Sequence, residues 1–146
     1  SLLLQKINNL NLTNIVEYVG SQAHVDLPHY FNKMDLFVFP TTLNESLGLV
    51  GLEAMACGIP VVGTNIGGLR TYIESGINGE LFESKNIHSL TKAIEKFLLM
   101  DIEVYSKYKE KSLETANNYD SNIVARRLVN KLISLIYSGG ITCLKY

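Results

Sequence analysis

Two carboxylates are the residues of this chain best placed to do chemistry. Glu45 and Glu53 lie eight positions apart, the first just before a predicted helix over 46–57 and the second about 10 Å along it. Helical side chains lean toward the N-terminus, so Glu53 can reach back along the helix. An ionised carboxylate only accepts hydrogen bonds, and it can accept from both hydroxyls of a vicinal diol. The pair therefore suits a ligand rich in hydroxyls, unless both are ordinary solvated surface residues.

The start of the predicted helix is a candidate anion site. Ser46, Leu47 and Gly48 are its first residues, and the first N–H groups of a helix lack intrahelical acceptors and lie at the positive end of its dipole. Gly48 also removes a side chain that would keep a ligand away. With the two carboxylates, this predicts a diphosphate at the helix end and a sugar ring on each side. The alternative is that Ser46 only caps the helix and that Gly48 only packs against a neighbour.

Around these residues, short apolar runs alternate with longer helical patterns along the chain. This alternation is typical of parallel strands joined by crossover helices, and it predicts an α/β fold. Strands are expected at Ile15–Val19, Leu36–Phe39, Val61–Gly63 and Gly79–Phe82. The second has no polar alternation, which indicates burial on both faces and a central place in the sheet. Loops at the carboxyl ends of such strands form the binding crevice, so the loop that contains Glu45 is expected there.

Helices are predicted between and after these strands. Ser46 and Ser121 are N-cap residue types, and Gly58 follows a helix end before Pro60. No repeat, low-complexity tract or linker divides the chain, so 1–137 is expected to form one domain, followed by a tail over 138–146. The predicted helices span Ser1–Asn8, Asp26–Asn32, Ser46–Cys57, Gly68–Ser75, Ile87–Met100, Val104–Asn117 and Ser121–Tyr137.

Composition excludes several classes of protein. The chain has 146 residues, of which 47% are hydrophobic and 18% charged, a globular balance for one core. No apolar run is long enough to span a membrane. With 13 basic and 14 acidic residues the net charge is -1, which makes nucleic acid an unfavourable partner. Cys57 and Cys143 are too few for a disulfide scaffold, which predicts a cytoplasmic protein. The first residue is not Met, and we expect the chain to be a piece of a longer protein.

The stretch with the two carboxylates closely resembles a known family. It reads Glu45-Ser-Leu-Gly-Leu-Val-Gly-Leu-Glu53-Ala-Met-Ala-Cys-Gly-Ile-Pro-Val-Val, and Gly67-Gly68 follows. This text resembles the C-terminal domain of the group 1 glycosyltransferases, also called glycosyltransferase family 4, which have the two-domain GT-B fold. The similarity extends over 15–137. It implies a three-layer Rossmann-like domain with a parallel sheet, the C-terminal half of a GT-B fold, without its first strand or strands.

The resemblance assigns roles to individual residues. Glu45 would contact the donor sugar as the catalytic-site carboxylate, Glu53 the nucleotide ribose, and the amides of Ser46, Leu47 and Gly48 the diphosphate. These roles describe a metal-independent, retaining transfer from a nucleotide-diphosphate sugar to an acceptor hydroxyl. The donor is a substrate, and no cofactor or metal ligand is expected.

Two glycine-containing turns also match positions in the family. Gly20 and Ser21, after a predicted strand that ends at Val19, match the turn that lines the nucleobase; the alternative is an ordinary strand-end turn. Gly67 and Gly68 open the next predicted helix beside the sugar-phosphate; the alternative is that they only make a tight turn.

The resemblance covers less than a whole enzyme. Family members carry an earlier strand with a Gly-Arg turn and a Lys that neutralise the diphosphate, and nothing in 1–14 matches it. The N-terminal domain that binds the acceptor is also missing, so we expect this chain alone to bind nucleotide weakly or not at all and to be inactive. Peripheral membrane association of the parent protein is left open.

Other functions stay open beside this one. The chain could serve as a non-catalytic nucleotide-binding or assembly module of the same fold, or derive from a sugar-nucleotide epimerase, against which the two-Glu motif argues. No strand is followed by Gly-x-Gly-x-x-Gly, so an oxidoreductase is disfavoured. His24, His29 and His88 are scattered and receive no catalytic role, and Cys57 is expected to be a small buried residue rather than a nucleophile.

Overall fold

The sheet has three parallel strands with the second in the middle. The computed structural model describes residues 2–137, and its strands are β1 (Phe37–Phe39), β2 (Val61–Thr64) and β3 (Gly79–Phe82) in the order β1-β2-β3. Every residue of β2 is buried. The parallel α/β sheet and the strands predicted at 61–63 and 79–82 are confirmed. The tail predicted over 138–146 lies outside the described residues.

The predicted central place of the 36–39 strand is wrong. Strand β1 lies at one edge, and all three of its residues are only half-buried. The strand predicted at Ile15–Val19 is irregular instead, and Ile15 is 81% exposed. A strand needs a neighbour to complete its hydrogen bonds, and among residues 2–137 no strand pairs with the outer edge of β1. The apolar run at 15–19 therefore has no ladder to join.

Most predicted helices form, with three corrections. Helix α3 begins at Leu49 rather than Ser46, the helix expected at 68–75 is a short 3-10 helix (η2), and the cap of α6 is Asp120 rather than Ser121. The Asp120 carboxylate accepts the N–H groups of Asn122 and Ile123 at 2.9 and 3.3 Å. The helices are α1 (Leu2–Asn9), η1 (His24–Asp26), α2 (Leu27–Phe31), α3 (Leu49–Ala56), η2 (Gly67–Thr71), α4 (Ile87–Leu98), α5 (Ile102–Asn118) and α6 (Ser121–Tyr137).

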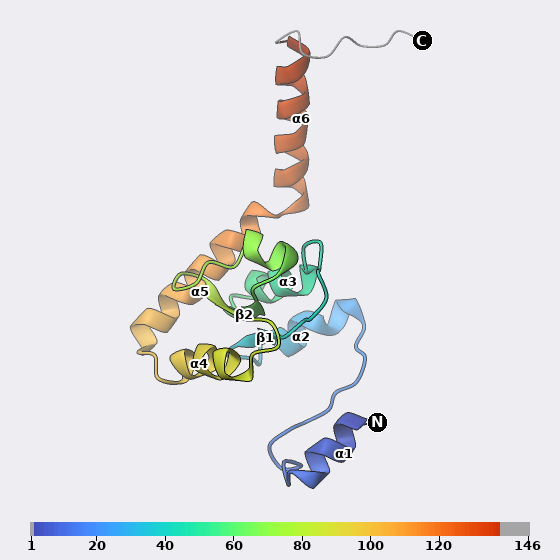
Figure 1. Ribbon diagram of the computed structural model, residues 1–146. Helices are drawn as coiled ribbons and strands as arrows, with labels where there is room; N and C mark the ends of the chain where they lie inside the picture. The colour runs from blue at the N-terminus through green and yellow to red at the C-terminus, as the bar shows by residue number, and fades with distance from the viewer. Residues whose placement is uncertain (1, 138–146) are drawn as a thin grey trace.

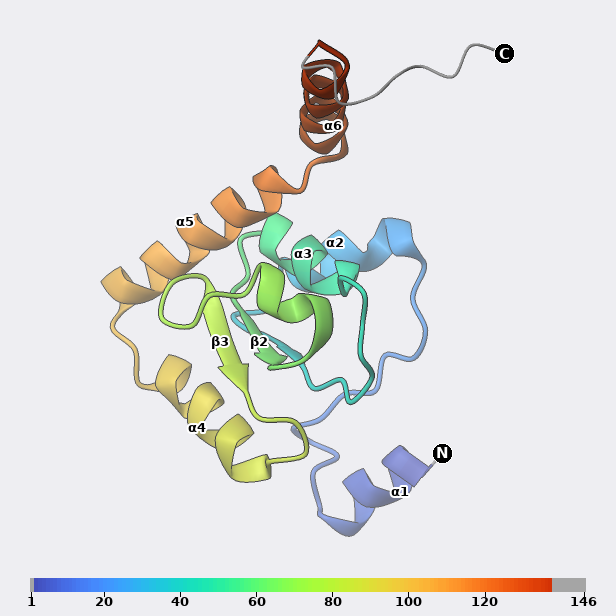
Figure 2. The same cartoon turned by 45° about the horizontal axis from the view of Figure 1, so that its top comes forward.

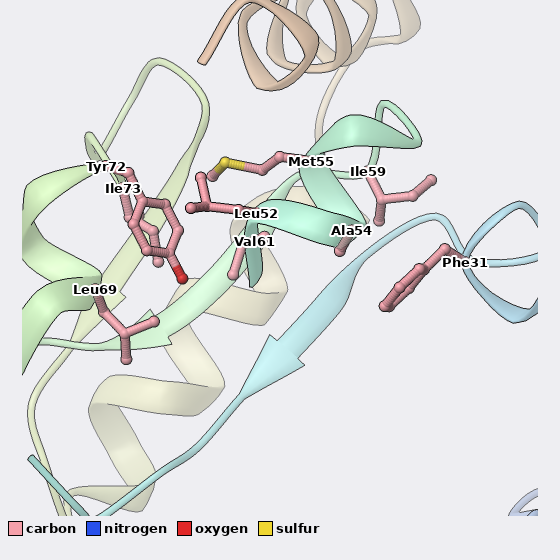
Figure 3. Close-up of a cluster of buried hydrophobic side chains, with 9 residues drawn as sticks. All are labelled: Phe31, Leu52, Ala54, Met55, Ile59, Val61, Leu69, Tyr72 and Ile73. Atoms are coloured by element: carbon pink, nitrogen blue, oxygen red, sulfur yellow. The ribbon is translucent and has the colours of Figure 1, made fainter. Parts of the chain in front are cut away.

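Helices cover both faces of the small sheet (Figures 1 and 2). Helices α2, α3 and α5 gather on one side, and α4 packs against β2 and β3 from the other. The main core lies on the α3 side, and Figure 3 shows it as a cluster to which α3 contributes Leu52, Ala54 and Met55, β2 contributes Val61 and η2 contributes Leu69. This core holds the first turns of α3 and η2 against the carboxyl ends of the strands.

Helix α6 projects away from this body in both views. It has no buried residue, and its apolar side chains at 128, 132 and 136 are about half exposed. Arg127 ties its first turns to the end of α5 by donating to the backbone oxygen and to Oδ1 of Asn118, at 3.2 and 3.0 Å. Within 2–137, no helix has the length and apolar character needed to cross a bilayer.

The buried carboxylate of Glu80 joins β3 to α4 and α5. Glu80 Oε1 accepts hydrogen bonds from Gly76 N–H at 3.0 Å, from Tyr108 Oη at 3.1 Å and from Lys96 Nζ. We expect Lys96→Met to lower the free energy of unfolding by about 1–3 kcal/mol, because Glu80 would stay buried without its cation. Urea denaturation measures this loss.

The pH dependence of this loss has a definite sign. The hydrogen bond to Glu80 raises the pKa of Lys96 above its ordinary value. The contribution of Lys96 is therefore complete below the unfolded pKa near 10.5, and it disappears as pH rises through the higher folded pKa. The exposed Lys92 of the same helix supplies the control, since Lys92→Met should change stability by less than about 0.5 kcal/mol. Equal losses in the two variants would contradict the prediction.

Candidate functional site

The loop from β1 to α3 carries Glu45. This half-buried residue lies in an irregular segment beyond the carboxyl end of β1. Two short contacts shape the segment: Leu43 N–H donates to Thr41 Oγ1 at 3.1 Å, and Glu45 N–H donates to the Leu43 oxygen at 2.9 Å. Because it follows β1, the loop lies at the carboxyl end of the sheet, where the binding crevice was predicted.

The next loop holds this segment from the side of β2. Gly68 N–H donates to the Glu45 oxygen at 2.8 Å. A Cβ on Gly68 would lie 2.1 Å from the Ser46 oxygen, and one on Gly67, whose φ is +54°, would lie 2.4 Å from the Glu45 oxygen. Both glycines are thus required by close backbone approach to the loop, a role that sequence reasoning missed although the doubled glycine was its signal.

Gly48 is explained by its own conformation and by packing. Its φ is +71°, in the left-handed region, and it stands directly before α3. A Cβ there would lie 2.9 Å from Cε1 of Phe39. The Gly48 oxygen accepts a hydrogen bond from Tyr72 Oη at 3.0 Å. Burial, with smaller effects from Tyr119 and Glu45, raises the pKa of Tyr72 well above its ordinary value, so this hydroxyl keeps its proton. These contacts agree with the alternative that Gly48 packs against a neighbouring part of the fold.

Three consecutive amides follow Glu45 directly, before the first turn of α3. Within the part of the chain that the structure describes, no protein acceptor receives the N–H of Ser46, Leu47 or Gly48. These residues precede α3 instead of forming its first turn. The cap position is held by Gly48 and no side chain caps the helix, so the prediction that Ser46 is its N-cap is wrong. Ser46 is exposed, and the other two residues are half-buried. The amides nevertheless lie directly before the positive end of α3, where an anion is favoured.

Glu53 lies in the second turn of α3 and has a partner. Its side chain is 31% exposed, and Oε1 lies 2.9 Å from Nε2 of His24 in η1. It lines a cavity of about 170 Å³ together with His24, Pro28 and Cys57. His24 and Glu53 are 29 positions apart, so no local pattern in the sequence could have predicted their contact.

The turn at Gly20 and Ser21 is exposed and follows an irregular segment rather than a strand. The Gln22 side chain donates to the Val19 oxygen, and its Oε1 accepts from Tyr30 Oη at 2.8 Å. This attaches the turn to α2. No hydrogen bond between described residues joins Gly20 or Ser21 to the Glu45 loop.

Cys57, at the end of α3, is half-buried. Burial raises the pKa of its thiol above the ordinary value. A thiol with a raised pKa carries little thiolate at neutral pH, so its environment does not favour nucleophilic chemistry.

Comparison with curated proteins finds similarity to glycosyltransferases. The D-inositol 3-phosphate glycosyltransferase of Mycobacterium marinum is 34% identical over 96 residues, which are 66% of this chain and 20% of that protein. The protein of the same name from Streptosporangium roseum is 33% identical over 90 residues, 62% of this chain and 20% of its own length. The chain thus spans about a fifth of the length of these relatives.

Solved structures share the fold. Sucrose-phosphate synthase from Thermosynechococcus elongatus superposes with a TM-score of 0.78 at 25% identity, over 94% of this chain and 34% of that one. The Anabaena protein HepE, in complex with UDP and glucose, gives 0.76 at 30% identity over 91% and 36%. The C-terminal domain of the group 1 family protein LpcC from Francisella tularensis gives 0.66 at 26% identity over 80% and 59%.

The family assignment covers most of the chain. Residues 2–115 match the family described as Glycosyl transferases group 1. The two-Glu stretch, the parallel sheet and the solved neighbours agree with that match. The chain therefore belongs to the group 1 glycosyltransferases and has the α/β fold of their GT-B C-terminal domain.

Proposed function

We propose that this chain is the donor-binding domain of a retaining glycosyltransferase, which transfers a sugar from a nucleoside-diphosphate sugar to an acceptor hydroxyl. The observation that carries the proposal is the run of three amides, Ser46 to Gly48, between Glu45 and the first turn of α3, which have no acceptor among the described residues. Solved neighbours of the chain hold UDP and glucose, or UDP-glucose, which supports a nucleotide-sugar donor.

Each group has a distinct part in this proposal. The three amides donate to the diphosphate, whose charge grows as the sugar leaves, and donors that are already in place stabilise that charge without reorganising. Glu45 accepts from hydroxyls of the donor sugar, and Glu53 from those of the ribose. The turn at Gly20 and Ser21 lines the base. Transfer needs no metal or cofactor in this scheme, because amides meet the diphosphate.

In this proposal the acceptor is bound by a second domain. We propose that an N-terminal domain of the parent protein binds the acceptor and faces this one, and that the parent acts in the cytoplasm. The exposed apolar side chains at 128, 132 and 136 of α6 are the surface we expect that domain to cover. Transfer requires donor and acceptor to be held in line, so the chain by itself should bind nucleotide weakly and not turn over.

Titration of the 15N-labelled chain tests the donor site. UDP, GDP and ADP are added up to millimolar concentration, and the amide resonances are followed by NMR. The expected result is that at least one nucleotide shifts the signals of Ser46 to Gly48. If none of the three nucleotides shifts these signals, the donor site is wrong, and the fold serves as an assembly module instead.

The ribose role of Glu53 is tested by its alanine variant. Glu53→Ala should weaken UDP binding about tenfold or more, since hydrogen bonds to a charged group contribute roughly 1.5–3 kcal/mol each. Inorganic diphosphate, which has no ribose, should bind as before. The exposed Glu95 of α4 provides the matched control, Glu95→Ala. Equal losses for UDP and diphosphate would refute the ribose role.

A further inference from the structure

A histidine from a distant segment holds the carboxylate of Glu53. His24 Nε2 and Glu53 Oε1 are 2.9 Å apart, and the two residues come from η1 and α3. An ionised carboxylate can only accept, so Nε2 carries the proton in this contact. The His24 ring is 83% exposed and the Glu53 side chain 31%. The contact therefore lies at the mouth of the cavity that both residues line.

His24 is not carried by a loose segment. Asp26 N–H closes η1 by donating to the Ala23 oxygen at 2.9 Å. Helix α2 follows at once, and its Phe31 is 3% exposed within the core. The Phe31 ring meets Phe37 of β1 edge-on, with centroids 5.5 Å apart. The position of His24 is therefore set by the same core that sets the position of α3.

The same segment also carries the turn at Gly20 and Ser21. Gln22 joins that turn to Tyr30 of α2, and His24 follows two residues later. The Gly20 turn lies before β1 and Glu53 lies between β1 and β2. The His24–Glu53 contact joins these two segments of the chain. Any ligand that touches both would meet two segments that the shared core and this hydrogen bond hold together.

We propose that His24 is a positioning residue of the nucleoside subsite, which fixes the Glu53 carboxylate for the ribose. This rests on the donor-binding role proposed above. A carboxylate has about four lone-pair positions on two oxygens. His24 occupies one on Oε1, which leaves Oε2 and the rest of Oε1 for two ribose hydroxyls. Without His24, Glu53 would exchange among rotamers and have to be ordered when the nucleotide binds.

Substitution of His24 should therefore affect the nucleoside and not the diphosphate. His24→Ala is expected to weaken UDP binding about two- to tenfold, the range for ordering one flexible side chain. Inorganic diphosphate should bind equally to both proteins. His24→Gln should restore UDP affinity, because its side-chain amide offers a donor at similar reach. His88→Ala, which removes an exposed histidine of α4, is the matched control and should change neither ligand.

A comparison of UDP with 2′-deoxy-UDP isolates the ribose contact. The wild-type chain should prefer UDP, and His24→Ala should reduce this preference. An unchanged preference, or tighter UDP binding by His24→Ala, would overturn the inference, the second because it would show that His24 competes with the ribose. Failure of His24→Gln to restore affinity would overturn it as well. Wild-type chain that binds no nucleotide would instead refute the proposed function itself.

Discussion

Gly68→Ala is expected to destabilise the chain by about 3 kcal/mol and to abolish UDP binding. The new Cβ would lie 2.1 Å from the Ser46 oxygen and 2.6 Å from Cα of Leu47. Both are backbone atoms, so no side chain can turn aside to make room. Relief requires the Glu45 loop to move away from η2, which breaks the 2.8 Å hydrogen bond from Gly68 N–H to the Glu45 oxygen. Overpacking of this kind typically costs about 1–3 kcal/mol, and the lost hydrogen bond adds to it.

Urea denaturation and the amide spectrum of the Glu45 loop measure the two effects. Gly76→Ala is the matched control: Gly76 has a φ of +86°, but no atom of residues 2–137 lies within 4 Å of the position that its Cβ would take. Gly76→Ala should lower stability only by the left-handed backbone penalty, about 1–2 kcal/mol, and it should leave the amide signals of the Glu45 loop unchanged. A Gly68→Ala chain that is as stable as the Gly76→Ala chain and binds UDP would show that the loop needs no such support.

Asn78→Ala is expected to cost about 3–5 kcal/mol of stability. Asn78 is 3% exposed. Its Oδ1 accepts Glu74 N–H at 2.8 Å, and its Nδ2 donates to the Tyr72 oxygen at 2.7 Å and to Thr115 Oγ1 at 2.8 Å. Truncation leaves a buried backbone oxygen and an amide without partners, at about 1–3 kcal/mol for each group. Because Tyr72 also donates to the oxygen of Gly48, the damage should extend to the loop before α3.

Two further variants separate the causes of this loss. Asn78→Asp keeps the shape but cannot donate to the Tyr72 oxygen, and it places a charge in a buried site, so it should be no milder than alanine. Asn122→Ala, at an exposed position of α6, should change stability by less than about 0.5 kcal/mol. Thermal unfolding ranks the three. A loss below about 1 kcal/mol for both Asn78 variants would contradict the prediction.

Elements with a complete local signal could be predicted from the sequence. Strand β2 is a short apolar run, β3 ends in the apolar pair Leu81-Phe82, and the ends of α4 and α5 were predicted to within two residues by periodicity. The start of α3 was wrong by three residues, because a serine before an apolar run also suits a loop. What decides the boundary is the left-handed backbone of Gly48, and left-handed glycine is found in turns as well as before helices.

Features that depend on distant partners could not be predicted. The apolar run at 15–19 has strand propensity, but propensity does not supply a neighbour with which to pair. The two-Glu motif located Glu45 and Glu53, yet the groups that hold them, Gly68 and His24, are 23 and 29 residues away. Such contacts arise only when distant segments of the chain fold together, and they leave no periodic or compositional signal in the sequence.

The edge position of β1 limits how this chain can pair with other chains. Backbone groups of successive residues in a strand alternate between its two sides. Phe37 N–H donates to the Pro60 oxygen, and the Phe39 oxygen accepts from Thr64 Oγ1, so both residues face β2. Only Val38 then directs its N–H and C=O outward from this three-residue strand. An incoming strand would gain about two hydrogen bonds, too few to template a fibril.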